Sequence, residues 1–327
     1  MPQARYRLID TQTTPYYHCI SRCVRRAFLC GFDRTTGKSF DHRKQWILDR
    51  VRQLTSVFAI NVCAYAIMSN HFHLVLFVDI EAADHWTFDE VVDRWLTLFK
   101  GPPVAQKYKA GEQLSVLEQN ELSSWVEVWR HHLADISWYM RCLNERIARM
   151  ANAEDDCKGR FWEGRFKCQA LLDEAAVISC MAYVDLNPIR AKLSKTLEDS
   201  EFTSVQERLQ KLKFRNSKTV DSPWLKPMSE SGIRSRDAIP LRLADYLALV
   251  DWTGRAIRHD KPGVIPSDVR PVLQTLGVLE ENWVANTQHF GQRFYRALGP
   301  VNRLRRLAER TGQQWIHGLT QAQAFYQ

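Results

Sequence analysis

The chain lacks several motifs that would assign it to common protein classes. Its eight cysteines are scattered and include no Cys-x-x-Cys pair, and in a chain of this size we expect no disulfide scaffold. It has no Gly-x-x-x-x-Gly-Lys-Ser/Thr loop for nucleotide phosphates. No apolar run approaches the roughly 20 residues that span a bilayer, and the N-terminus has no apolar segment of signal-peptide length. We therefore expect a cytoplasmic protein with no membrane partner.

The charge is biased toward basic residues. With 45 Lys and Arg against 37 Asp and Glu, the formal net charge of the 327 residues is +8. A basic excess favours a polyanionic partner, and nucleic acid is the commonest one. The 11 Trp and 15 Phe include side chains that could stack on unpaired bases, although we expect most of them in the core.

Two histidines stand at the start of an apolar run. His71 and His73 flank Phe72 in the segment 67–78, which is rich in Val, Leu and Phe and is typical of a buried strand. Because side chains alternate along a strand, both imidazoles lie on one face. Such a pair can bind a divalent metal. It can equally be two polar residues on the solvated face of an edge strand.

The periodicity predicts alternating strands and helices. A tight connection at Ser69-Asn70 predicts that two strands pair antiparallel, and Asp173 is a plausible N-cap. The expected order is strand 16–24, helix 41–58, strands 60–67 and 71–78, helix 82–100, an irregular stretch to about 122, helix 124–153, a strand within 159–172 and helix 175–187. Without a helical insertion at about 101–155, this is the split βαβ or ferredoxin-like pattern, an α+β fold with an antiparallel sheet.

The character of the sequence changes after this pattern. We expect a first domain over residues 1–200. Residues 201–240 contain several prolines and polar residues and are typical of a linker. Residues 241–327 return to helical periodicity, which predicts an α-helical C-terminal domain.

Four basic residues are candidates for contacts with DNA phosphates. Arg22 and Arg25 lie at the end of the first expected strand, and Arg165 and Lys167 lie in a segment where basic and aromatic residues alternate. This mixture suits a single-stranded nucleic acid, in which phosphates meet cations and bases stack on rings. The aromatic side chains could equally pack inward; they are Phe161, Trp162 and Phe166.

Three segments together resemble one protein family. Residues Met68-Ser69-Asn70-His71-Phe72-His73-Leu74-Val75, Gly159-Arg160-Phe161-Trp162-Glu163-Gly164-Arg165-Phe166 and Ala182-Tyr183-Val184-Asp185-Leu186-Asn187-Pro188-Ile189-Arg190-Ala191 are similar to the REP-associated tyrosine transposases. These form a branch of the single-tyrosine HUH transposases of bacteria. The resemblance covers roughly residues 15–195.

The resemblance implies a site and a cofactor. It implies that His71 and His73 are metal ligands, that Tyr183 is the nucleophile, and that Asn187 is a third, polar metal ligand. The metal would be Mg²⁺ or Mn²⁺, acting as a Lewis acid on the scissile phosphate.

The implied activity is cleavage and rejoining of DNA strands through a covalent 5′-phosphotyrosine. The DNA would be single-stranded or a hairpin, here a repeated extragenic palindrome, and the protein would act at the bacterial nucleoid. The resemblance leaves open whether the protein is a monomer or a homodimer. The alternative is a non-catalytic nucleic-acid-binding protein with a ferredoxin-like sheet, in which the histidine pair has no role.

Overall fold

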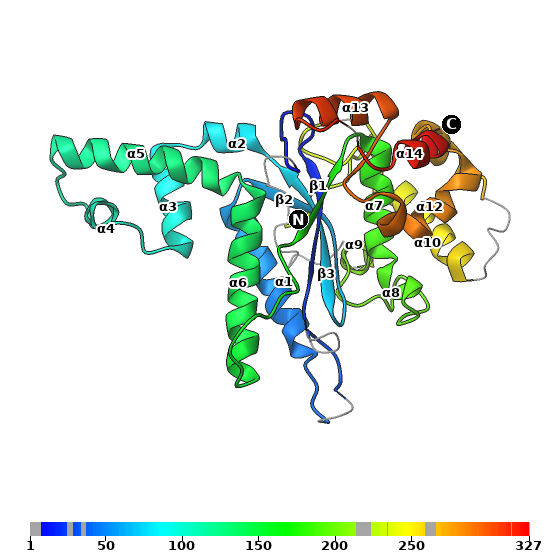
Figure 1. Ribbon diagram of the computed structural model, residues 1–327, viewed down its shortest axis with the longest axis horizontal. Helices are drawn as coiled ribbons and strands as arrows, with labels where there is room; N and C mark the ends of the chain where they lie inside the picture. Colours follow the sequence, from blue (N-terminus) through cyan, green and yellow to red (C-terminus); the bar gives the residue numbers. More distant parts are fainter. Residues whose placement is uncertain are drawn as a thin grey trace.

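The computed structural model describes residues 8–24, 29–33, 37–213, 224–233, 235–258, 266–314 and 316–326. The chain is an α+β protein, as expected, and Figure 1 shows a central sheet with helices on both sides. The strands are β1 (Tyr16–Arg22), β2 (Ile60–Ile67), β3 (His71–Val78), β4 (Lys167–Leu171) and β5 (Ala297–Leu298). Within the described ranges, no helix has both the length and the apolar character to cross a membrane.

Fourteen helices surround this sheet in the described part of the chain. They are α1 (His42–Val57), α2 (Ile80–His85), α3 (Phe88–Leu98), α4 (Pro103–Lys109), α5 (Val116–Leu133), α6 (Ile136–Glu154), α7 (Glu174–Asp185), α8 (Asn187–Arg190), α9 (Ser204–Lys213), α10 (Leu243–Arg258), α11 (Arg270–Thr275), α12 (Glu280–Arg293), α13 (Val301–Arg310) and α14 (Leu319–Tyr326).

The sheet is mixed and has the strand order β2-β3-β1-β4-β5. The first four strands pair antiparallel, and the expected pairing of β2 with β3 is confirmed. The short strand β5 comes from the C-terminal part of the chain and pairs parallel with β4. In β1 and β3, Ile20 lies opposite His73 and Arg22 lies opposite His71. The histidine pair is therefore on a central strand.

Both faces of the sheet are covered by helices. On one face α1 and α6 pack on side chains such as Phe72 and Leu74, and on the other α7 packs on Val75 and Phe77. The histidines share the face of Val75, because residues two apart on a strand point the same way. This face is closed by α7, so His73 is only 2% exposed.

The segment between β3 and β4 differs from the expected helices in three places. The single helix expected over 82–100 is α2 and α3, because the Thr87 hydroxyl accepts a hydrogen bond from the Glu90 N–H (3.2 Å) and caps the start of α3. The stretch 101–122, expected to be irregular, contains α4 and the start of α5, which begins with a capping box between Ser115 and Glu118. The single helix expected over 124–153 is instead two helices, because the Asp135 carboxylate accepts a hydrogen bond from the Trp138 N–H (2.9 Å) and starts α6. Helices α3 to α5 form an arm that projects from the sheet (Figure 1).

The stretch expected to be a linker is packed in its described part. Leu225 forms a bridge to Val62 of β2, and the Lys226 N–H donates to the Val62 carbonyl (2.8 Å). Leu225 and Ile239 are 3% and 0% exposed. Strand β2 is at the edge of the sheet, and covering an edge strand protects its backbone groups from pairing with other chains. Composition indicated only that this segment is polar.

The C-terminal helices share a buried core with the sheet. Trp283 and Phe290 of α12 belong to the same buried cluster as Val75 and Met181. Parallel pairing of β5 with β4 joins this region to the sheet as well. The helical periodicity of residues 241–327 predicted the helices but not what their apolar faces would cover.

A buried carboxylate holds the end of α7. Asp185 is 0% exposed and accepts hydrogen bonds from the Tyr246 hydroxyl (2.6 Å), the Val205 N–H (3.0 Å) and the Ser204 hydroxyl. These bonds connect α7 to α9 and α10. Burial raises the pKa of Asp185 to about 6, although its hydrogen bonds act in the opposite direction.

We expect Asp185→Ala to lower the free energy of unfolding by about 3 kcal/mol, because three buried donors lose their acceptor. Urea unfolding measures this loss. Asp251→Ala is the control, because Asp251 is exposed and forms an exposed ion pair with Arg255, worth less than about 1 kcal/mol. Equal losses in the two variants would contradict the structural role of Asp185.

The pKa of Asp185 also sets a pH dependence. A folded-state pKa above the ordinary aspartate value of 3.8 means that the neutral carboxyl is favoured in the folded protein. Its contribution to stability is complete below about pH 4 and is lost as the pH rises through about 6. The stability difference between the wild type and Asp185→Ala should therefore be larger at pH 4 than at pH 7.

Candidate functional site

A cavity of about 710 Å³ opens where β3 begins, beside α7 and α12. It brings together residues that are far apart in the sequence. His71, His73 and Tyr183 all line it. So do Leu8, His18, Ile20, Arg22, Arg160, Glu163, Gly164, Arg165, Phe166, Lys167, Cys168, Gln169, Arg190, Gln288, His289, Gly291, Gln292, Phe294, Tyr295 and Arg296.

Three imidazoles meet on the wall formed by the sheet. The ring centroids of His71 and His73 are 4.8 Å apart, and those of His18 and His73 are 5.1 Å apart. Burial lowers the pKa of His18 and of His71 to about 4, with the charges of Arg22 and Arg190 adding to the shift of His71. Burial also holds the pKa of His73 well below its usual range. At neutral pH all three rings are uncharged, which is the form that binds metals.

Hydrogen bonds fix the orientation of these rings. His18 Nε2 and His73 Nδ1 are 2.9 Å apart, and His18 Nδ1 is 3.0 Å from Gln169 Oε1. His71 Nδ1 is 2.6 Å from the side-chain oxygen of Asn70. The Nε2 atom of His73 is buried and has no hydrogen-bond partner among the described residues. A buried nitrogen without a partner is unfavourable unless a ligand completes it.

Tyr183 lies across the cavity from the histidines on α7. Its helix is made mostly of small and apolar residues and is buried on every side, so it fits between the sheet and α12. The Tyr183 ring contacts the ring of His73 edge to face (5.6 Å between centroids) and stacks on Phe290 of α12 (5.0 Å). The Arg190 guanidinium lies over the same ring, 4.2 Å from its centroid. These contacts hold the phenol beside the imidazoles.

A glycine of α12 lies against the hydroxyl of this tyrosine. A Cβ atom at Gly291 would stand 2.9 Å from Tyr183 Oη and 3.6 Å from Cζ. The first distance is shorter than real Cβ contacts, so the phenol oxygen occupies its place only because residue 291 has no side chain.

The cavity is strongly basic. One carboxylate, Glu163, lines it together with six cationic side chains: Arg22, Arg160, Arg165, Lys167, Arg190 and Arg296. Such an excess favours binding of phosphate groups. Three of the four DNA-contact candidates, Arg22, Arg165 and Lys167, are among these residues. Arg25 lies outside the described residues.

The geometry decides between the two alternatives for two aromatic residues and shows where Asn187 lies. Phe161 and Trp162 are 2% and 9% exposed, so they pack inward and are not available to stack on bases. Asn187 is 7% exposed at the start of α8 and is not among the residues that line the cavity. Its side-chain nitrogen has no hydrogen-bond partner within the described ranges.

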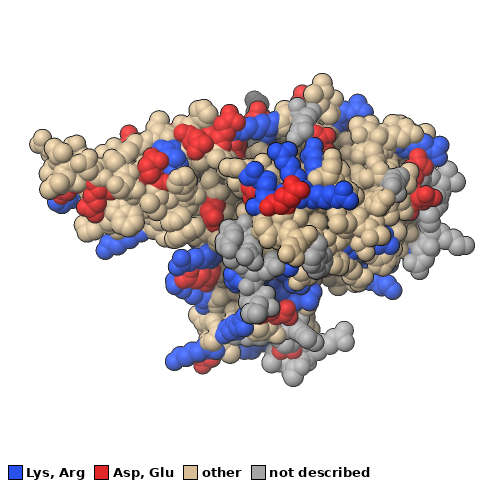
Figure 2. Space-filling view, turned by 45° about the horizontal axis from the view of Figure 1, so that its top comes forward, with Lys and Arg blue, Asp and Glu red and all other residues tan. Residues whose placement is uncertain are grey.

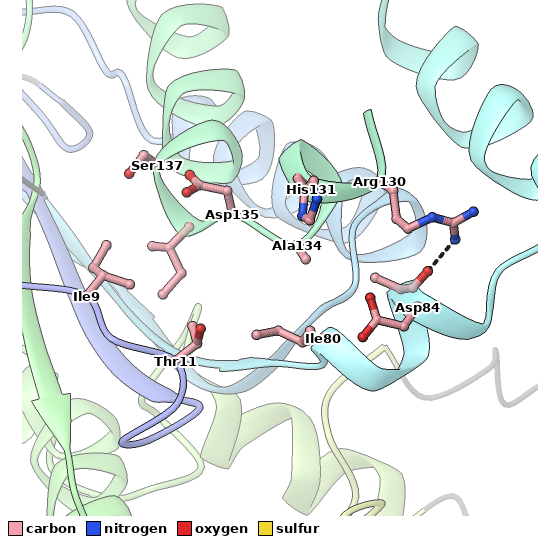
Figure 3. A pocket seen from close by; sticks show the side chains of 11 residues that line it. Ile9, Thr11, Ile80, Asp84, Arg130, His131, Ala134, Asp135 and Ser137 are labelled. Carbon is pink, nitrogen blue, oxygen red and sulfur yellow. Dashed lines mark hydrogen bonds between the residues drawn. The ribbon is translucent and has the colours of Figure 1, made fainter. Parts of the chain in front are cut away.

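A second cavity, of about 410 Å³, lies between α2, α5 and α6 (Figure 3). The Arg130 guanidinium that lines it donates to the carbonyls of Ala83 (2.6 Å) and Trp86 (2.7 Å). Asp84 and Asp135 add carboxylates to its wall. This cavity therefore lacks the positive charge that distinguishes the histidine cavity.

A further group of basic residues lies on α13. Figure 2 shows Lys and Arg gathered around this helix together with acidic side chains. Arg310 is paired with Asp10 (2.5 Å), and Arg303 donates to the carbonyl of Leu172. Leu172 follows the C-terminal end of β4, whereas Lys167 at the other end of β4 borders the cavity. The basic face of α13 is therefore separate from the cavity.

Sequence reasoning missed several residues of the site. Arg190 could have been found, because it follows Tyr183 by seven residues, or about two helical turns. His18 could have been found only with the register of β1 against β3. Phe290 and Gly291 had no sequence signal, since they come from a helix about a hundred residues away from Tyr183.

Comparisons with known proteins give little further information. No protein-family model matches the sequence, and no curated protein matches it significantly. One solved structure, described as "Structure of the REP associates tyrosine transposase bound to a REP hairpin", aligns with 70% of this chain and 99% of its own chain. The sequence identity is 10% and the TM-score is 0.38. Values this low leave the function to be inferred from the residues of the site.

The Gly291 contact predicts a coupling between two substitutions. Alanine in a helix is more stable than glycine by about 1 kcal/mol. We expect Gly291→Ala to stabilise the Tyr183→Phe protein, which lacks the obstructing oxygen, and to destabilise the wild type. Urea unfolding of the four proteins gives the coupling free energy, expected to exceed about 1 kcal/mol. The same effect of Gly291→Ala in both backgrounds would show that the contact is absent.

Proposed function

We propose that the chain is a metal-dependent enzyme that cleaves and rejoins DNA strands through a covalent bond to Tyr183. The observation that carries this proposal is the meeting of Tyr183 with two neutral imidazoles, His71 and His73, in a cavity lined by six cations. A nucleophile, a candidate metal site and a phosphate-binding surface are thus within one cavity.

The residues support a phosphoryl transfer that needs no nucleotide. The Tyr183 oxygen would attack phosphorus, the bond from phosphorus to the 3′ oxygen would break, and the phenol proton would end on the released 3′-hydroxyl. The product is a 5′-phosphotyrosine, and attack by a 3′-hydroxyl reverses the step. Arg190, which lies over the Tyr183 ring, is in position to bind the phosphate that the tyrosine attacks.

The histidines fit a divalent metal ion. Both rings are neutral, and the unpartnered Nε2 of His73 is a suitable ligand atom. Mg²⁺ or Mn²⁺ at this place would act as a Lewis acid on the scissile phosphate. We propose Asn187 as a third protein ligand. Asn187 does not line the cavity, and its side-chain nitrogen has no hydrogen-bond partner among the described residues.

The topology supports the same family of activities. The elements β1, α1, β2, β3, α6 and β4 follow one another as in the split βαβ or ferredoxin-like pattern, which we propose as the core of the fold. We propose single-stranded DNA, or a hairpin with a single-stranded flank, as the substrate. A repeated extragenic palindrome in the bacterial nucleoid is one such hairpin.

Covalent attachment to labelled DNA tests this function. Hairpin oligonucleotides from the DNA flanking the gene, labelled at the 5′ or the 3′ end, are incubated with the protein and Mn²⁺ or Mg²⁺ and analysed on denaturing gels. The wild type should give an adduct that carries the 3′ label. Tyr183→Phe should give none and still bind the DNA, because only one hydroxyl is removed. His71→Ala and His73→Ala should reduce the adduct at least about 100-fold, since they remove metal ligands.

Tyr295 offers a matched control, because it lines the same cavity and is 60% exposed. Tyr295→Phe should keep the adduct. An adduct that is lost in Tyr295→Phe and kept in Tyr183→Phe would show that Tyr295, and not Tyr183, is the nucleophile. Binding without cleavage by the wild type, for every flanking sequence tried, would favour the non-catalytic nucleic-acid-binding protein.

The basic lining predicts a salt dependence. The logarithm of the DNA-binding constant falls linearly with the logarithm of the salt concentration. Each contact with a phosphate of single-stranded DNA contributes about 0.7 to the magnitude of this slope. Lys167→Ala should therefore reduce this slope by about 0.7 in a fluorescence binding assay. Lys107→Ala is the control, because Lys107 lies on the arm and pairs with Glu118 (2.7 Å). An unchanged slope in Lys167→Ala would remove Lys167 from the DNA-binding surface.

A further inference from the structure

A chain of hydrogen bonds connects the C-terminal part of the protein to His73. The side-chain nitrogen of Gln169 donates to the Phe294 carbonyl. The side-chain oxygen of Gln169 is 3.0 Å from His18 Nδ1, and His18 Nε2 is 2.9 Å from His73 Nδ1. Gln169, His18 and His73 are 6%, 1% and 2% exposed. Water cannot replace these contacts without opening the core.

The direction of every hydrogen bond in this chain follows from its first member. A carbonyl oxygen can only accept, so Gln169 must turn its NH₂ group to Phe294 and its oxygen to His18. His18 Nδ1 must then carry a proton. His18 is buried and contacts no carboxylate among the described residues, so its ring is neutral and holds one proton. Its Nε2 atom therefore accepts, and the donor is the Nδ1–H group of His73.

We propose that this chain positions His73 as a metal ligand, because it keeps the ring proton on Nδ1 and leaves the Nε2 lone pair for an ion in the cavity. His18 and Gln169 are then positioning residues, and the Phe294 carbonyl gives the C-terminal region a part in the site. This inference rests on the proposed metal-dependent function. It agrees with the unpartnered state of His73 Nε2 in the described structure. Partners of this kind commonly fix the tautomer of metal-binding histidines.

His71 is oriented by a simpler device of the same kind. Its Nδ1 atom is 2.6 Å from the side-chain oxygen of Asn70, the residue before it. An amide oxygen only accepts, so the proton of His71 is also on Nδ1 and its Nε2 atom is also left for a ligand. The two candidate ligands thus offer the same nitrogen. One is set by its neighbour in the sequence, and the other by a residue more than two hundred positions away.

The tautomer can be observed directly by NMR. Long-range proton–nitrogen correlation spectra of metal-free protein labelled with [¹⁵N]histidine distinguish the two neutral tautomers, and His73→Gln identifies the signals of His73. The wild type should have its His73 proton on Nδ1. A His73 proton on Nε2 in the wild type would overturn the inference. Apart from the His73→Gln variant used for assignment, this measurement is made on the wild-type protein alone.

Metal affinity tests the consequence. The loss of the free Mn²⁺ signal in electron paramagnetic resonance gives the dissociation constant without any DNA. Gln169→Leu should weaken Mn²⁺ binding about 10-fold, and His18→Phe between about 10- and 100-fold. Gln169→Glu should retain most of the affinity, because a protonated carboxyl can accept from His18 and donate to Phe294. His132→Phe, in the arm, is the control for His18→Phe and should bind as the wild type does.

The outcomes separate the inference from the function on which it rests. Gln169→Leu with wild-type Mn²⁺ affinity, in a wild type that forms the DNA adduct, would overturn the positioning role alone. A wild type that shows the expected tautomer but binds no Mn²⁺ would contradict the metal-dependent function and the role of the chain together. Weaker Mn²⁺ binding in Gln169→Leu, with recovery in Gln169→Glu, is the result that supports both.

Discussion

The packing of α7 against the histidine face of the sheet is the constraint on which the rest of the structure depends. This helix is buried on all sides, and it places Tyr183 over a face that carries three imidazoles. Burying polar rings costs free energy unless they are hydrogen-bonded. The bonds of His18 with Gln169 and His73 satisfy most of that requirement. Among the described residues, His73 Nε2 is left without a hydrogen-bond partner, and this atom lies at the cavity.

The C-terminal region completes this arrangement from the other side of α7. Phe290 stacks on Tyr183, Gly291 gives room to its hydroxyl, and the Phe294 carbonyl ends the chain of hydrogen bonds that leads to His73. One short segment therefore contacts both the candidate nucleophile and the support of a candidate ligand. The helices of this region share a core with the sheet, and this packing holds the segment in place.

The excess of positive charge distinguishes this cavity from the basic face of α13 and from the second cavity. The six cations around it have one carboxylate among them. On α13, by contrast, Arg310 is already paired with Asp10. In the second cavity Arg130 is bound by backbone carbonyls. A phosphate is therefore best accommodated beside Tyr183, where six cationic side chains outnumber one carboxylate in the lining.

Local patterns in the sequence determined the strand of His71 and His73, its pairing with β2, the N-cap of α7 and the α+β class, because each depends on residues close in the chain. They did not determine that α5 and α6 are separate helices or that residues 224–240 cover the edge of β2 where described. Nor could they place His18, Gln169, Phe290 and Gly291 around Tyr183. Those contacts depend on strand register and on which apolar faces meet, and only the three-dimensional packing of distant segments decides both.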